Sequence, residues 1–233
     1  MEKEEIYWHQ RSRENWLKSG DKNSRYFHSQ ASYRKAQNYI IGLYNEHGDW
    51  VDSKEGFFGV IQDYFSNVFC SASSSTQDIS RVLEYVQPCL ASSKSSFLDS
   101  NFSDEEIRRA IFDMAPTKAP GPDGLSTLFN QKLWPIMGSN VTKTCLMVLN
   151  EGHDITLANR TLITLIPKVK KMEKMSDFHP ISLCNVLCKI IVKALTTRLR
   201  GVLGDVISEK QSAFIPGRLI SNNTMWVSSA CMG

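Results

Sequence analysis

The side chains best suited to hold a metal ion are six cysteines, at positions 70, 89, 145, 184, 188 and 231. None of them forms a CxxC pair, and only Cys184 and Cys188 are spaced to share one face of a helix. Two thiolates can bind zinc, but no second ligand pair with zinc-site spacing accompanies them. The spacing therefore favours buried structural thiols over a metal pair, and free thiols indicate a reducing compartment.

Basic side chains are concentrated in three segments. Residues 11–35 carry seven Lys/Arg against two acidic residues, residues 160–174 carry five against one, and residues 189–218 carry six against two. Residues 41–115 are acidic, with twelve Asp/Glu against five Lys/Arg. Aromatic residues interleave with the first basic segment, and aromatics can stack on bases while cations pair with phosphates. The pattern is typical of nucleic-acid contact, and equally of solvated helix faces beside one buried aromatic stripe.

The first hundred residues are predicted to form a lead-in region rather than a compact domain. Residues 40–52 predict a β-hairpin, because two β-type runs flank a turn-prone loop containing Gly48. Residues 54–69 have the apolar spacing of a helix. The polar, serine-rich stretches 70–80 and 89–96 have the composition of flexible linkers.

Helices dominate the next fifty residues. Ser103 and Glu106 form a capping box that starts a helix, and Pro116 ends it. Two more helices are predicted, over about 125–137 and 140–151. The first of these is expected to turn four side chains inward: Leu125, Leu128, Phe129 and Leu133.

Short strands and one long helix follow. The apolar, β-branched run 162–166 predicts a buried strand, and the extended run from Phe178 predicts a second one. Residues 186–200 have the pattern of an amphipathic helix, and Ser221 is placed to cap another. The fold class is therefore α+β, mostly helical with short strands.

The stretch "KAPGPDGL" between two predicted helices is a rigid bend. Its prolines fix φ, its glycines permit positive φ, and its aspartate can accept hydrogen bonds from nearby amides. Taken alone, this composition is typical of a plain helix–helix connector. The turn residues are Pro120, Gly121, Pro122, Asp123 and Gly124.

Four segments in order give the chain a specific resemblance: "KAPGPDGL", "LITLIPKVKK", "DFHPISLCNVLCKIIVKALTTRLR" and "SEKQSAFIPGRLISNN". Together they resemble the N-terminal part of the reverse transcriptase of non-LTR, LINE-type retrotransposons, over about residues 100–233. The upstream "WLKSGDKNSRYFH" resembles the segment that joins endonuclease to polymerase in such polyproteins. The resemblance implies a lead-in over 1–100, then a helical N-terminal extension and partial fingers over 101–233.

The same resemblance implies four contacts to nucleic acid or nucleotide. Lys118 would be the phosphate contact of the bend, which belongs to the extension that seats the template. Lys168, a long cation after a strand, would approach template or nucleotide phosphates. Arg218 would line the template path, with simple loop solvation as the alternative. The family has the sequence F-R-P-I-S where this chain has "FHPIS". His179 therefore replaces an arginine, whose planar guanidinium is always charged, and this puts triphosphate contact at this position in doubt.

Catalysis in this family uses two metal ions, expected to be magnesium, held by paired aspartates on adjacent strands. The given sequence ends at Gly233, before the positions where the family places these aspartates. No carboxylate pair on an apolar strand replaces them. The carboxylates considered are assigned to helix starts, turns or loops: Asp104, Glu105, Glu106, Asp113, Asp123, Asp205 and Glu209. The sequence predicts no catalytic residue, metal or cofactor in this chain.

We therefore expect a fragment of an RNA-directed DNA polymerase that binds an RNA template or an RNA/DNA hybrid and is inactive alone. The missing polymerase half is a candidate partner. The alternatives are a non-catalytic RNA-binding module derived from a retroelement and a non-functional, degenerate reading frame. No apolar run approaches the roughly 20 residues that span a bilayer, and "MEKEEIYWHQ" lacks a signal core. An intracellular location, nuclear or cytoplasmic, without a membrane partner is expected.

Overall fold

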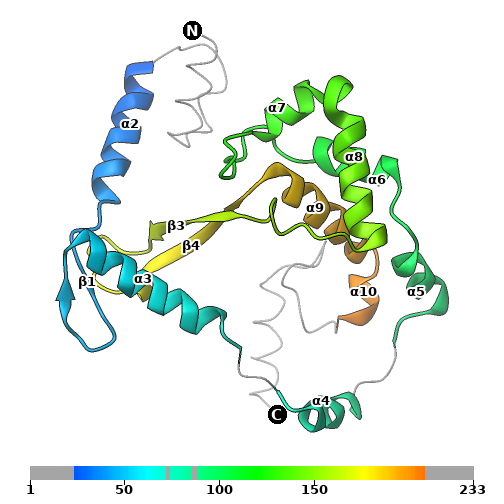
Figure 1. Ribbon diagram of the computed structural model, residues 1–233, viewed down its shortest axis with the longest axis horizontal. Coiled ribbons are helices and arrows are strands. Elements are labelled where there is room, and N and C mark those ends of the chain that lie inside the picture. The colour runs from blue at the N-terminus through cyan, green and yellow to red at the C-terminus, as the bar shows by residue number, and fades with distance from the viewer. Residues whose placement is uncertain (1–23, 72–73, 86–88, 208–233) are drawn as a thin grey trace, which may run out of the picture. The chain divides into compact units, whose positions relative to one another are not determined.

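The computed structural model describes residues 24–71, 74–85 and 89–207 (Figure 1). They confirm an α+β fold that is mostly helical and has two two-stranded sheets. The described residues pack as two compact units. The first holds the described part of Met1–Ser73 together with Thr161–Leu183, and the second holds the described part of Ser74–Arg160 and Cys184–Gly233.

The first unit begins with α2 (Ser24–Gln37) and a short antiparallel hairpin. Strand β1 (Leu43–Tyr44) pairs with β2 (Trp50–Val51), which confirms the predicted hairpin. Helix α3 (Lys54–Phe69) confirms the helical spacing of 54–69. It begins where the Ser53 hydroxyl accepts a hydrogen bond from the Gly56 amide, at 3.1 Å.

The second sheet of this unit consists of β3 (Thr161–Pro167) and β4 (Phe178–Cys184), joined through the 3₁₀ turn Met175–Asp177. Both predicted strands are present, but the prediction that the run 162–166 is buried is wrong, because Leu162 and Ile163 are 53% and 39% exposed. One small core connects this sheet to the hairpin and to α3, and its buried members are Leu43, Phe65, Met175 and Phe178. Segments more than a hundred residues apart in the sequence therefore share one core.

The second unit is helical. It contains α4 (Thr76–Leu83), α5 (Ser92–Asp99), α6 (Asp104–Phe112), α7 (Thr127–Lys132), α8 (Trp134–Glu151), α9 (Val186–Arg200) and α10 (Leu203–Val206). Helices α6, α8 and α9 pack against one another (Figure 1) and supply most of the core. Its buried members are Ile107, Ala110, Ile111, Met114, Cys145, Val186, Ile190, Ile191 and Ala194. The predicted capping box at the start of α6 is present, and so is the helix over 186–200.

The prediction of flexible linkers over 70–80 and 89–96 is wrong in part. Helix α4 occupies Thr76–Leu83 and helix α5 occupies Ser92–Asp99. The Ser75 hydroxyl accepts a hydrogen bond from the Asp78 amide at 3.1 Å and so starts α4. Serine is typical of linkers, but it is also a preferred N-cap residue. Composition alone could not separate these two roles.

The helix boundary predicted near residues 137–140 is also wrong, because α7 ends at Lys132 and α8 begins at Trp134. Pro135 lies in the first turn of α8, where its missing N–H costs nothing, whereas inside a helix it would remove a hydrogen bond. Leu125 and Phe129 are 36% and 40% exposed, so the prediction that they point inward is wrong.

The predicted boundary between residues 100 and 101 separates a lead-in region from the N-terminal part of a reverse transcriptase domain. The compact units divide the chain differently, since Thr161–Leu183 pack with the described part of Met1–Ser73. Packing units and functional regions need not coincide. The functional boundary therefore stays a prediction.

Candidate nucleic-acid interface

The bend of residues 118–125 packs closely on the start of α9. A Cβ atom on Gly121 would lie 2.5 Å from both the backbone nitrogen and the side-chain oxygen of Asn185. Gly121 is therefore needed for close approach, and not for a positive φ as the sequence suggested. Gly124 has φ +71°, so that part of the prediction is confirmed.

Asn185, the residue just before α9, holds this bend in place through its side-chain amide. Its Oδ1 accepts a hydrogen bond from the Asp123 amide at 3.4 Å, and its Nδ2 donates to the Ala158 carbonyl at 3.0 Å. The Asp123 carboxylate accepts a hydrogen bond from the Leu125 amide at 3.0 Å, as its type predicted. The bend is thus tied to α9 and to the loop before β3.

Two lysines lie close to the bend. Lys189 on α9 donates from Nζ to the Ala119 carbonyl at 2.6 Å. Partial burial lowers the pKa of Lys189, and the nearby charge of Lys118 lowers it further. Lys118 itself is exposed. Lys118, Lys189 and the Asp123 carboxylate therefore lie near one another at this bend.

In the first unit, Lys168 occupies a fixed position directly after β3. Its backbone amide donates to the Asp177 carbonyl at 2.8 Å, and its Nζ donates to the Ser176 carbonyl at 2.9 Å. The residue is exposed, so the ammonium is held in place while it faces solvent.

The connection between β3 and β4 is held by one carboxylate. Asp177 accepts hydrogen bonds from the amides of Glu173 and Lys174, at 3.0 and 2.9 Å. These bonds hold the pKa of Asp177 below its usual range. The basic loop that follows Lys168 therefore has a defined backbone.

The remaining predicted contacts are His179 and Arg218. His179 is exposed on β4, in the same unit as Lys168. Arg218 lies outside the described residues, as does Ser221, and so does much of the first basic segment. Lys118 belongs to the second unit and Lys168 to the first.

Sequence reasoning missed an ion pair that holds the second unit together. Arg198 on α9 is 5% exposed and contacts both carboxylate oxygens of Glu106, with Nε to Oε1 at 2.6 Å and Nη2 to Oε2 at 2.9 Å. The guanidinium also donates to the carbonyls of Ser100 and Asn101 and lies over the Phe102 ring, 3.5 Å from its centre. The hydrogen bonds to Arg198 lower the pKa of Glu106 to about 2. The only local signal, a basic residue late in a helix, is too common to predict such a pair.

The cysteines that could have bound metal are placed as structural thiols. Cys188 is buried, and its thiol donates to the Ala158 carbonyl at 3.2 Å, while Cys184 is half-buried. Burial raises the pKa of Cys145 to about 12 and raises that of Cys188 as well. Within the described part of the chain, no group of three or more His, Cys, Asp or Glu side chains could hold a metal ion.

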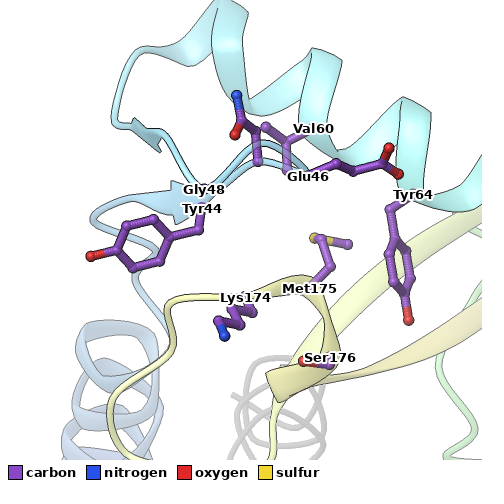
Figure 2. Close-up of a pocket in the computed structure, with 9 residues that line it drawn as sticks. Tyr44, Glu46, Gly48, Val60, Tyr64, Lys174, Met175 and Ser176 are labelled. Atoms are coloured by element: carbon purple, nitrogen blue, oxygen red, sulfur yellow. The ribbon is translucent and has the colours of Figure 1, made fainter.

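A pocket of about 540 Å³ opens in the first unit (Figure 2). It lies between the β1–β2 hairpin, α3 and the β3–β4 connection. Its lining residues are Tyr44, Asn45, Glu46, Gly48, Val60, Tyr64, Lys174, Met175 and Ser176. Sequence patterns did not predict it, because the part of the β3–β4 connection that closes it lies more than a hundred residues after the hairpin and α3.

The chain is similar to a transposon protein over most of its length. The chain is 27% identical over 217 residues to the "Transposon TX1 uncharacterized 149 kDa protein" of Xenopus laevis. The match covers 93% of this chain and 16% of that protein. No protein-family model matches the chain. The similarity supports an origin of the chain in a retroelement. In the described ranges, no helix is long and apolar enough to cross a bilayer.

Proposed function

We propose that this chain is the part of a retroelement reverse transcriptase that precedes the catalytic aspartates, and that it binds an RNA template or an RNA/DNA hybrid. The observation that carries the proposal is the order of the four motifs. The chain that contains them matches a transposon protein over 93% of the chain's own length. On this reading, residues 1–233 as a separate polypeptide bind nucleic acid without extending a primer. Magnesium and the remaining polymerase residues belong to the larger enzyme.

The placement of Lys168 supports this proposal. Its ammonium is fixed by Ser176, and the loop behind it is fixed by Asp177. A fixed cation loses little conformational entropy when it binds a phosphate, so the contact retains more of its electrostatic free energy. Lys170 adds to the charge of the same loop.

The test is RNA binding by the full chain over a range of salt concentrations. Lys168→Gln removes one charge but keeps an N–H donor for the Ser176 carbonyl, so the hairpin retains a bond there. The variant should weaken binding at every sequence tested and reduce the slope of log affinity on log salt by about one. His179→Arg adds a permanent cation on β4, and it should strengthen binding and steepen that slope.

Lys143→Gln is the matched control, because Lys143 is an exposed lysine on α8 and does not belong to the β3–β4 hairpin. Equal effects of Lys168→Gln and Lys143→Gln would reject a phosphate contact at the hairpin. An affinity that does not depend on salt would reject template binding by charge altogether. Salt-dependent binding by a cooperatively folded chain would exclude a degenerate reading frame.

A further inference from the structure

Helix α9 has a second apolar side that the described residues leave open. Val192, Leu195 and Leu199 are three and four positions apart, so they lie along one side of the helix. Their exposed fractions are 60%, 40% and 48%. We call these three residues the α9 stripe. The side of α9 that packs on α6 and α8 follows a separate four-residue repeat: Val186, Ile190, Ala194 and Arg198.

The composition of α9 is unusual for a helix that packs on one core only. Such a helix has one apolar side, and the rest of its surface is polar. The polar side of α9 carries Lys189, Lys193 and Arg200, and the α9 stripe lies apart from it. Single exposed apolar side chains are ordinary, but a continuous apolar row along one helix is typical of a surface that packs against another segment.

The described chain ends at an anchored point next to the α9 stripe. Helix α10 packs against the end of α9 (Figure 1), and its Asp205 forms an ion pair with Lys94 on α5. In the turn between α9 and α10, the Val202 amide donates to the Leu199 carbonyl at 3.0 Å. The last described residue is Ile207. The rest of the chain therefore starts near the Leu199 end of the stripe.

The chain after Ile207 is long enough to cover the stripe. From Leu199 to Val192 is seven residues of helix, or about 10 Å at 1.5 Å per residue. Phe214 is seven residues after Ile207, so it can lie up to about 25 Å away. Phe214 and Ile215 are the first large apolar residues after Ile207. The short tether keeps their effective concentration at the stripe high, and it costs less loop entropy than a later segment would.

We propose that Phe214 and Ile215 pack on the α9 stripe of the same chain. Three residues separate Ile215 from Arg218, so this packing would hold Arg218 within about 10 Å of the stripe. Arg218 would then be fixed on the unit that also carries Lys118. This role of Arg218 rests on the proposed RNA binding, whereas the packing itself requires no RNA.

The test is thiol labelling of the full chain with a cysteine placed in the stripe, read site by site by mass spectrometry. Leu195→Cys should react about tenfold more slowly than the same cysteine in a chain that also carries Phe214→Ser and Ile215→Ser, because full burial of one such side chain is worth at least that factor. Thr197→Cys is the matched control, since Thr197 is exposed on another side of α9. It should label equally in both chains.

Three results would overturn the packing. The first is equal labelling of Leu195→Cys with and without the serine substitutions. The second is protection that increases with chain concentration, which would assign the stripe to a second copy. The third is an equal acceleration at Thr197→Cys, because loss of structure in α9, not uncovering of the stripe, would then be responsible.

RNA binding tests the role of Arg218. Arg218→Gln should reduce the slope of log affinity on log salt by about one in the chain that keeps Phe214 and Ile215, and by less in the chain with the serine substitutions. Equal reductions in both chains would overturn the positioning of Arg218 by the stripe. Absence of any RNA binding would overturn the proposed function, and the labelling results would still decide the packing.

Discussion

Replacing Arg198 by Lys should destabilise the second unit strongly, although it preserves the charge. The guanidinium makes two bonds to Glu106 and two to backbone carbonyls, and it lies over the Phe102 ring. A lysine ammonium is a point charge that cannot make this planar set of bonds. The substitution would therefore leave carbonyl groups and part of a carboxylate without donors.

The magnitude follows from the burial of the pair. Removing one partner of a buried ion pair costs about 3–5 kcal/mol, and lysine keeps part of the attraction. Because Glu106 is 28% exposed and can recruit water, we place the loss at the low end, about 3 kcal/mol. That is a large share of the roughly 5–15 kcal/mol that stabilises an ordinary domain.

Amide hydrogen exchange, followed by mass spectrometry, is the suitable assay because it reports on α6 and α9 independently of the first unit. A loss of about 3 kcal/mol should speed exchange in peptides from these helices about 100-fold where exchange occurs through unfolding of the unit. Arg200→Lys, an exposed change in the same last turn of α9, is the control and should change exchange less than threefold. If the two variants exchange alike, the bonds of Arg198 do not stabilise α6 and α9.

Three further predictions concern the second unit and the thiols. The pKa of Glu106 is lowered from 4.5 to about 2, so its carboxylate stabilises the fold above pH 4.5, and this contribution is lost as the pH falls toward 2. Glu106→Gln should thus cost about 2 kcal/mol at pH 7, after allowance for exposure, and much less at pH 3, as measured by urea unfolding. Gly121→Ala would place a methyl group 2.5 Å from Asn185 and should cost about 1–3 kcal/mol, seen as faster amide exchange across the bend. Cys145, whose pKa burial raises to about 12, should resist a thiol reagent at pH 8 that modifies the exposed Cys70 quickly.

The two substitutions have matched control variants within the chain. Glu105→Gln changes an exposed carboxylate of the same helix and should show no comparable pH-dependent loss. Gly59→Ala has no atom within 4 Å of its new methyl group and lies inside α3, so it should be neutral or stabilising. A pH-independent cost of Glu106→Gln would contradict the linkage argument. A harmless Gly121→Ala would contradict the close approach, and rapid labelling of Cys145 in the folded chain would contradict its burial.

The sequence by itself determined those elements whose signals are local. Ser103 and Glu106 are three residues apart, so their capping box could be recognised without knowledge of the fold. The spacing of apolar residues in 54–69, the β-branched run of β3 and the turn composition of 118–125 are local in the same way. Where local signals were ambiguous, as for the serine-rich start of α4, composition gave the wrong answer.

Only the tertiary structure decided what these elements hold together. Glu106 was assigned to a helix start, but its second role, binding Arg198, depends on a residue 92 positions away. Gly121 was assigned to backbone freedom, whereas Asn185 shows that it is needed for space. The pocket beside Lys174 arises where a hairpin, a helix and a distant loop meet. Contacts of this kind depend on which faces pack together, and sequence patterns define the faces of single elements without specifying their partners.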